Sequence, residues 1–463
     1  MDGTKRSSKR VAIVGAGHGG GSVAAMLRQS GFAGEVVLIG DEPVVPYHRP
    51  PLSKSLLKGE LLQPLQPAAF YEEQSITLRT ATRVLAIDRV GCSVQLDNGE
   101  SLEYDTLVLA TGARPRALRL PGMEFEGVHE LRTVAHAHTL RELVDHSTSV
   151  AIVGGGWIGL EVAASARAAG AAVTVLEREE HLLTRVASPE LTAAVAQRHL
   201  EAGTRVLTGV RVAGLRAGTD GHVAAVSLAD GSEVAADLVL VAVGAVPDDE
   251  LAHAAGLRCE DGVVVDASAR TEDPRIFAVG DIASQPRELL GGRSLRLESI
   301  PSAIEQARQV VAAILGEKPP DPEVPWFWSD QFDLKVQIAG IIVDVDQTIV
   351  RDELPTRLSV VHLRGDRLVA IEAINAARDF VAGRNLIRSG DPVDAGAIRN
   401  PLVSIRDCVH SAVVPAESAH DAPEDVSQVA DLPGPGNVNG APQRSSFWPT
   451  AGSMPHRSTQ ACL

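Results

Sequence analysis

The stretch VAIVGAGHGGGSVAAMLRQSGFAGEVVLIGD, residues 11–41, decides the fold. A short apolar run enters a glycine-rich turn, a helical pattern follows and ends near Gly31, and a second apolar run comes after it. The turn contains Gly15, Gly17, Gly19 and Gly20 and fits the pattern GxGxxG. In such a turn the first glycine permits the tight bend, the second lets the backbone approach a pyrophosphate, and the third lets helix and strand pack closely. The helix N-terminus then favours the anion.

A glycine motif alone is a weak signal, because ordinary turns also contain it. Here the strand–turn–helix context and a downstream acid support nucleotide binding. Asp41 follows the second strand, about twenty residues beyond Gly20, where a carboxylate accepts hydrogen bonds from ribose hydroxyls. We therefore expect a dinucleotide at this first unit.

The same plan returns at residues 149–177, SVAIVGGGWIGLEVAASARAAGAAVTVLE, with Gly154, Gly156 and Gly159 in the turn. Glu177 ends the second strand of this unit. A carboxylate there accepts a bond from a 2′-hydroxyl and repels a 2′-phosphate, which favours NADH over NADPH. The neighbouring Arg178 leaves two alternatives open, a phosphate-binding arginine and a plain surface Glu–Arg pair.

Each unit is followed by an alternating polar and apolar stretch with a tight turn, at residues 79–104 and 204–234, and then by an apolar strand. Strands that alternate with helices predict parallel, doubly wound sheets. The predicted fold class is therefore α/β, with two Rossmann-like domains for FAD and NAD in a glutathione-reductase-like architecture. Short alternating strands after Pro325, followed by a helical stretch, add a C-terminal α+β domain. The expected domains are 1–118 with 247–325 for FAD, 119–246 for NAD, 326–415 for the C-terminal domain, and 416–463 as a disordered tail.

Composition limits the possible partners and location. The formal net charge of −16 argues against nucleic acid or anionic lipid as a general partner. No apolar run approaches the roughly 18 residues of a membrane span, and the N-terminus lacks the apolar core of a signal peptide. The four cysteines, at 92, 259, 408 and 462, fit neither a metal site nor a disulfide framework. We expect a cytoplasmic protein without a metal and leave its oligomeric state open.

Six longer sequence phrases are spread over the chain, and each of the three expected domains contains at least one of them. They are PYHRPPLSK (46–54), LVLATGARPR (107–116), GGGWIGLEVAA (154–164), FAVGDIA (277–283), ESIPSAIEQAR (298–308) and PWFWSDQFDLKVQIAG (325–340). With them the chain resembles the FAD-dependent NADH:ferredoxin reductases of the putidaredoxin reductase and rhodocoxin reductase type, from about residue 10 to about residue 401. The tail has no counterpart in that family.

The resemblance implies site residues. Lys54 would lie beside the flavin ring, where a cation stabilises the charge that a flavin gains with hydride. Glu161 would reach the ring from the NAD domain and orient that ammonium; a solvated lysine and a helix-surface glutamate are the alternatives. Asp281 would hold the ribityl or pyrophosphate region, cap a helix, or do both. Further residues expected at FAD are Val84, Thr111, Gly112, Arg132, Gly280, Ile300 and Trp328, and further residues expected at NAD are Ile158 and Gly244.

The region 41–54 lacks the cysteine that disulfide reductases of this architecture place against the flavin. Electrons are therefore expected to leave the flavin directly for a small [2Fe–2S] ferredoxin that supplies a cytochrome P450 or another oxygenase. The alternatives are a rubredoxin, a nitrite-reductase partner or a small-molecule acceptor, and a binding or signalling flavoprotein similar to apoptosis-inducing factor. Because such ferredoxins are acidic, a local positive patch is needed for docking, with Arg308, Trp328 and Lys335 as candidates.

Overall fold

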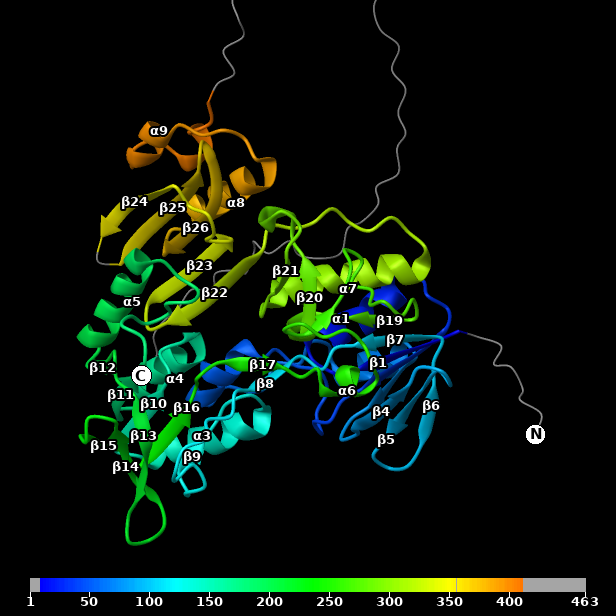
Figure 1. The fold of residues 1–463 in the computed structure, drawn as a ribbon, viewed down its shortest axis with the longest axis horizontal. Helices are drawn as coiled ribbons and strands as arrows, with labels where there is room; N and C mark the ends of the chain where they lie inside the picture. Colours follow the sequence, from blue (N-terminus) through cyan, green and yellow to red (C-terminus); the bar gives the residue numbers. More distant parts are fainter. Residues whose placement is uncertain (1–8, 355, 411–463) are drawn as a thin grey trace, which may run out of the picture. The chain divides into compact units, whose positions relative to one another are not determined.

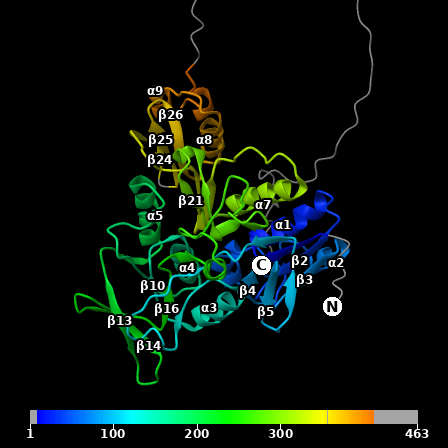
Figure 2. The same ribbon diagram turned by 45° about the vertical axis from the view of Figure 1, so that its right-hand side comes forward.

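The computed structural model describes residues 9–354 and 356–410 (Figure 1). The first sheet is parallel, in the order β19-β7-β1-β2-β3. Its strands are β1 (Arg10–Val14), β2 (Glu35–Ile39), β3 (Ile76–Arg79), β7 (Thr106–Leu109) and β19 (Ile276–Ala278). Helices α1 (His18–Gln29) and α7 (Ile300–Leu315) lie side by side against it in both ribbon views (Figures 1 and 2). The strand–turn–helix prediction for residues 11–41 is confirmed.

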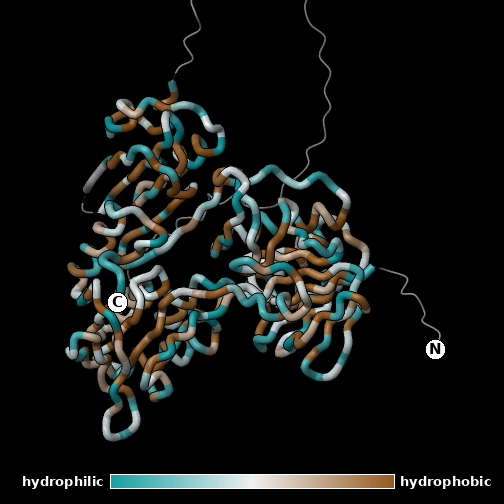
Figure 3. The backbone as a smooth tube through the Cα atoms, in the orientation of Figure 1, coloured by the Kyte–Doolittle hydropathy of each residue, from teal (hydrophilic) through white to brown (hydrophobic). Residues whose placement is uncertain are grey.

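Strand β1 explains why its sequence is a continuous apolar run. Val11 and Ile13 face the core that holds α1 and α7, whereas Ala12 and Val14 face a second core on the other side of the sheet. Successive side chains of a strand point to opposite faces, so a strand covered on both faces is apolar at every position. Figure 3 shows the same feature as brown segments inside the sheets.

The second sheet repeats this arrangement in the order β12-β11-β10-β16-β9. Its strands are β9 (Val128–His129), β10 (Ser149–Val153), β11 (Ala172–Leu176), β12 (Arg205–Leu207) and β16 (Leu238–Val241). The helices of this part of the chain are α3 (Val134–His146), α4 (Trp157–Ala168) and α5 (Pro189–Glu201). Each unit contains the alternating stretch predicted above, which forms a small antiparallel sheet and is called its antiparallel excursion. In each unit the first strand pairs in parallel with the strand after the helix and with the strand after this excursion. The predicted duplication is confirmed.

Both antiparallel excursions are present. The first is the sheet β4 (Val84–Asp88), β5 (Ser93–Leu96), β6 (Ser101–Glu103), and the second is β13 (Val212–Ala217), β14 (Val223–Leu228), β15 (Glu233–Ala235). Each covers the face of its parallel sheet that the helices leave open.

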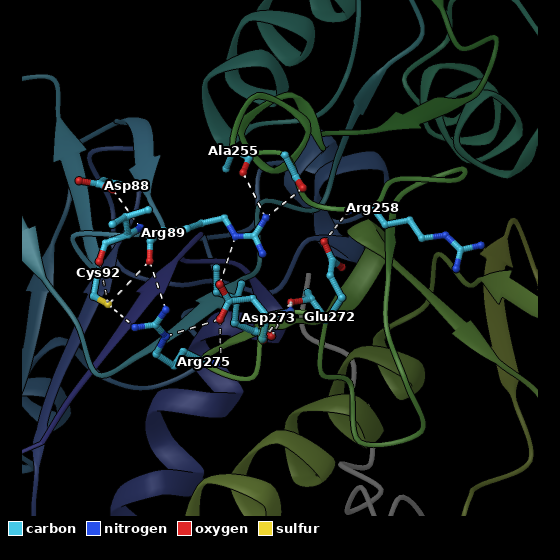
Figure 4. A network of polar contacts seen from close by, with 12 residues as sticks. Asp88, Arg89, Cys92, Ala255, Arg258, Glu272, Asp273 and Arg275 are labelled. Atoms are coloured by element: carbon cyan, nitrogen blue, oxygen red, sulfur yellow. Dashed lines mark hydrogen bonds and ion pairs between the residues drawn. The ribbon is translucent and has the colours of Figure 1, made fainter.

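A polar network ties the first excursion to the loop before β19 (Figure 4). The Asp273 carboxylate forms an ion pair with Arg89 at 3.1 Å and a second, longer ion pair with Arg275 at 3.6 Å. Arg275 in turn donates to the sulfur of Cys92. Arg89 also donates hydrogen bonds to the carbonyls of Ala255 and Gly256, which connects the segment after helix α6 (Glu250–Ala254) to this network. These contacts fix the excursion against the first parallel sheet.

The chain passes between the two nucleotide units through a two-stranded sheet of β8 (Ala113–Pro115) and β17 (Ala245–Pro247). The first unit also carries helix α2 (Ala68–Glu73) and the small sheet β18 (Val263–Val264), β20 (Ala283–Pro286), β21 (Ser294–Arg296). The predicted boundaries between the FAD and NAD domains lie close to β8 and β17. These boundaries stay a prediction.

The C-terminal sheet is antiparallel, in the order β22-β23-β26-β25-β24, as the alternating pattern predicts. Its strands are β22 (Trp326–Gln331), β23 (Leu334–Gly340), β24 (Gln347–Leu354), β25 (Arg357–Arg364) and β26 (Arg367–Ile374), followed by α8 (Ala377–Ser389) and α9 (Ala395–Arg399). Sequence reasoning missed β22 as a strand, because its aromatic and polar residues do not alternate simply. One face of the sheet packs on α8 and the other packs on the NAD unit. The predicted tail lies outside the described residues.

Across residues 9–354 and 356–410, every helix is too short or too polar to cross a lipid bilayer.

Candidate flavin and nicotinamide site

A cavity of about 950 Å³ lies where the first glycine turn, the end of β7 and the N-terminus of α7 meet. Every residue expected at FAD lines it except Gly20. The lining set from that expectation is Gly15, Gly17, Gly19, Asp41, Lys54, Val84, Thr111, Gly112, Arg132, Gly280, Asp281, Ile300 and Trp328. Residues far apart in the sequence are therefore brought to one site.

Two different physical reasons explain why glycine occupies the positions of the first turn. Gly15 has φ +112°, and a Cβ on it would lie 2.1 Å from the carbonyl oxygen of Ala110. A Cβ on Gly20 would lie 1.9 Å from the oxygen of Gly15, so this glycine lets the helix approach the turn and has no need to line the cavity. A Cβ on Gly17 would meet no protein atom closer than 3.8 Å. Since protein contacts do not require glycine there, the bare backbone fits the close approach of a pyrophosphate.

His18 begins helix α1 beside this turn and lines the cavity. Burial, and after it the neighbouring His48, Arg49 and Arg132, lowers the pKa of His18 to about 3. Its Nε2 lies 3.3 Å from Nδ1 of His48. The imidazole is thus neutral at physiological pH. Sequence reasoning passed over it as a variable position of the motif.

Two arginines line the cavity beside the turn. Arg132 Nη2 lies 3.2 Å from the Asp281 carboxylate. Arg49 donates to the Arg132 carbonyl at 2.7 Å and to Glu42 at 3.0 Å. Asp281 stands in a short 3₁₀ helix that has no side-chain cap, so the alternative that it caps a helix is wrong. Arg49 was missed, although it lies inside the quoted phrase PYHRPPLSK.

The backbone beside Asp281 is held by α7. The N–H of Gly280 donates to Oε1 of Gln306 at 2.7 Å, and Gln306 is 1% exposed. Ser299 caps α7 through the N–H of Ser302, and Ile300 follows the cap at the cavity wall. The start of this helix is therefore fixed next to Gly280 and Asp281.

Lys54 and Glu161 form an ion pair of 2.7 Å between Nζ and Oε1. Lys54 follows a short 3₁₀ helix, Pro50–Ser53, and Glu161 lies in α4 of the second unit. The lysine side chain is 18% exposed and the glutamate side chain 5%. The alternatives of a solvated lysine and a helix-surface glutamate are both wrong.

Aromatic side chains from the second unit and the C-terminal sheet close this side of the cavity. Trp157, at the start of α4, packs on Phe327 with ring centroids 5.2 Å apart. Trp328 is half-buried, lines the cavity and lies 5.3 Å from the ring of Trp326. Ile158 also lines this cavity, although it was expected at NAD. The second unit thus supplies part of the wall of the first unit's site.

The second glycine turn repeats the first. Gly154 has φ +110°, and its Cβ would lie 2.4 Å from the oxygen of Ala242, while a Cβ on Gly159 would lie 2.4 Å from the oxygen of Gly154. A Cβ on Gly156 would meet nothing within 4 Å. The cradle therefore fits a second pyrophosphate by the same argument.

Glu177 lies against this turn and accepts a hydrogen bond of 2.6 Å from the N–H of Gly155. Arg178 is bound to Glu179 at 2.6 Å, so its ion pair in this structure is with Glu179, and the alternatives for Glu177 and Arg178 stay open. Arg185 was missed: a Cβ on Gly244 would lie 3.2 Å from its Nη2, which places a cation at this second turn.

Among the described residues, no thiol lies at the cavity wall. Cys92, Cys259 and Cys408 are free, and none of them lines the cavity. Burial raises the pKa of Cys259 to about 11, with Asp249 and Glu272 adding to the effect, and burial also raises the pKa of Cys408. Cys462 lies outside the described residues.

Comparisons with known proteins agree with this geometry. Residues 9–307 match the family described as pyridine nucleotide-disulphide oxidoreductase, and residues 326–409 match the reductase C-terminal family. The chain belongs to the pyridine nucleotide-disulphide oxidoreductases. The resemblance that the six phrases carry is thereby confirmed, together with the fold class.

The oxidoreductase has well-matched relatives. It is 43% identical over 403 residues to a probable ferredoxin reductase of Castellaniella defragrans, covering 86% of this chain and 98% of the relative. It is 39% identical to putidaredoxin reductase of Pseudomonas putida, covering 89% and 100%. Among solved structures, the reductase in a covalent putidaredoxin reductase–putidaredoxin complex matches with a TM-score of 0.84 and 38% identity, covering 87% and 98%.

The residues present fit FAD and NADH, the cofactors of this family. The large cavity with a pyrophosphate cradle suits FAD, and the second cradle with Glu177 suits NADH. FAD held by these residues would supply hydride acceptance from a nicotinamide and the release of single electrons. The protein's own contribution is to hold Lys54 at the cavity wall, to bring the second unit against it, and to line that wall with the packed rings of Trp157 and Phe327.

Proposed function

We propose that this chain is an NADH-dependent ferredoxin reductase, which passes electrons from NADH through FAD to a small [2Fe–2S] ferredoxin that supplies a cytochrome P450 or another oxygenase. The observation that carries the proposal is the position of Glu161. It belongs to the helix after the second glycine turn, yet it lines the cavity of the first turn and pairs there with Lys54. A nicotinamide held by the second unit therefore faces a flavin held by the first.

The acceptor follows from the missing thiols and from the relatives. Reduction of a disulfide substrate needs a reactive cysteine against the flavin, and the described cysteines lie away from the cavity. The relatives named above are ferredoxin reductases. Because one hydride carries an electron pair and a [2Fe–2S] centre accepts one electron, each NADH reduces two ferredoxins and releases one proton.

The assigned site residues are part of this proposal. Lys54 stabilises the charge that the flavin gains, and Glu161 orients Lys54 toward it. Arg132, Asp281 and the first glycine turn hold the FAD phosphates and ribityl chain. Glu177 accepts the 2′-hydroxyl of NADH, and Arg185 faces its phosphates. The cytoplasm is the proposed location, where the described thiols remain reduced.

The proposed docking surface comprises Arg308, Trp328 and Lys335. Arg308 is half-exposed and paired with Glu323, which also receives Arg384 at 3.1 Å, so two cations share one carboxylate. Lys335 is exposed and stands opposite Asp330 in the β22–β23 pair, on the same face as Trp328. The surface is therefore locally less acidic than the chain as a whole.

The direct test is NADH-driven reduction of a panel of acceptors by the purified protein. The panel contains several [2Fe–2S] ferredoxins, a rubredoxin and ferricyanide. Fast, saturable reduction of at least one ferredoxin supports the proposal. Reduction of rubredoxin or ferricyanide alone would assign a different acceptor.

A further inference from the structure

A continuous chain of buried hydrogen bonds ends on Glu161. His199 Nε2 and Gln331 Oε1 are 2.9 Å apart, Gln331 Nε2 donates to Ser329 Oγ at 3.2 Å, and Ser329 Oγ donates to Glu161 Oε1 at 2.6 Å. All four residues, taken with their backbone, are 4% exposed or less. The chain runs from α5 through the C-terminal strand β22 and back to α4.

The direction of donation along this chain is fixed from its Glu161 end. A carboxylate accepts only, so Ser329 must donate its proton to Glu161. Ser329 then accepts from the Gln331 amide, whose oxygen accepts from His199. The imidazole must therefore carry its proton on Nε2, which leaves Nδ1 bare; this atom is buried and has no partner among the described residues. Burial lowers the pKa of His199, which agrees with a neutral ring.

Glu161 is thus held by donors at both oxygens. Its Oε1 lies 2.7 Å from Nζ of Lys54 and accepts a hydrogen bond of 2.6 Å from the Ser329 hydroxyl. Its Oε2 accepts a hydrogen bond of 2.5 Å from the Ser53 hydroxyl. Ser53 is itself fixed, because its carbonyl accepts from Ser165 at 3.0 Å. These donors hold the buried carboxylate in place, and its ion pair in turn holds the Lys54 ammonium at the cavity wall.

Strand geometry explains why the C-terminal sheet can supply this donor. Ser329 and Gln331 are two residues apart in β22, so they face the same side, and the sheet presents that side to the NAD unit. Trp328 directly precedes Ser329 in the strand and faces the opposite side. Alternate residues of one strand therefore serve Glu161 and the proposed docking surface.

We propose that Ser329 is a positioning residue for hydride transfer: its hydroxyl, oriented by Gln331 and His199, fixes Glu161 and through it Lys54 against the flavin. The proposal rests on the proposed function. It gives the C-terminal domain a part in the first half-reaction, in addition to its part in docking.

The test compares three variants with the wild-type holoenzyme. Ser329→Ala removes the hydroxyl, and Ser329→Thr restores one. The matched control is Ser359→Ala, because Ser359 is equally buried in β25 and donates to Asp379 at 2.9 Å, away from the cavity. Should Ser329→Ala not fold, Ser329→Cys replaces it, with similar size and a weak donor.

Anaerobic stopped-flow reduction by NADH gives the limiting rate and the apparent dissociation constant. We expect Ser329→Ala to lower the limiting rate about tenfold, as the loss of a hydrogen bond to a charged group does, and to change the dissociation constant less than about twofold. Ser329→Thr should recover the rate to within about twofold, and Ser359→Ala should leave it unchanged.

Potentiometric titration of the bound flavin provides the second readout. Lys54→Met should make the midpoint potential more negative, since a cation near the reduced flavin is lost. Ser329→Ala should shift it in the same direction in the wild type and have no further effect in the Lys54→Met background, because both act through one path.

An unchanged rate in folded Ser329→Ala, an equal loss in Ser359→Ala, or additive potential shifts would overturn the proposal. In each of these outcomes a wild type that binds FAD and takes hydride from NADH leaves the proposed function standing. A wild type that does neither overturns both.

Discussion

The carboxylate of Glu177 accepts a 2.6 Å hydrogen bond from the backbone N–H of Gly155, which fixes it beside the second glycine turn. A 2′-phosphate at this position would meet a fixed negative charge. We predict that Glu177→Ala lowers the ratio of kcat/KM for NADH to that for NADPH by about tenfold, mainly because NADPH improves. Steady-state kinetics with ferricyanide measure the ratio.

A second variant separates repulsion from attraction. Arg178 is bound to Glu179, so Glu179→Ala releases the guanidinium and should also improve NADPH, by a smaller factor. A wild type that prefers NADPH would contradict the assignment of Glu177 and point to Arg178 or Arg185.

Docking of ferredoxin should depend on charge at the proposed surface. We predict that Arg308→Glu or Lys335→Glu slows ferredoxin reduction at low salt several-fold while NADH-to-ferricyanide activity stays within about twofold, because a small oxidant needs only access to the flavin. Arg308→Gln is the milder control, since it leaves Glu323 paired with Arg384. Equal losses with both acceptors would mean that the flavin site was disturbed, and no loss would place the patch elsewhere.

Turnover should not need a thiol. Replacing Cys92, Cys259 and Cys462 by Ser and the buried Cys408 by Ala should leave NADH-to-ferredoxin turnover within about twofold, because none of the described cysteines lines the cavity. Visible spectra establish FAD loading first. Loss of turnover in a folded, FAD-loaded variant would reveal a thiol step.

Acid should weaken the fold through His199. Burial lowers the pKa of this imidazole below its ordinary value of about 6.5, so the unfolded chain takes up a proton more readily. The stability that the neutral ring contributes is fully present above the ordinary pKa of about 6.5, and it is lost as the pH falls below that value. We predict that Tm falls less between pH 7.5 and about 5.5 in His199→Asn than in the wild type.

Local patterns predicted the two βαβ units well, because each strand is buried on both faces and each turn needs glycine for contacts within the same unit. Gly15 and Gly154 meet carbonyls of the neighbouring strand, a relationship that the motif itself encodes. Lys54 and Glu161 were found only through the family resemblance, since nothing in either segment indicates their ion pair.

Contacts between units were the part that sequence reasoning missed. Ser329, Gln331 and His199 are common residue types in unrelated segments, and only the packing of β22 on α4 and α5 brings them together. Arg49 and His18 lay within quoted motifs, but their roles depend on neighbours more than eighty residues away or on burial. Periodicity within one element carries no information about such pairs.

The most direct test of the account is an anaerobic titration of the purified protein. We predict one FAD per chain, full bleaching of the flavin by one equivalent of NADH, and return of the flavin absorbance when an oxidised [2Fe–2S] ferredoxin is added, with about two ferredoxins reduced per NADH. FMN or no flavin on denaturing extraction, or a flavin that NADH does not bleach, would contradict it.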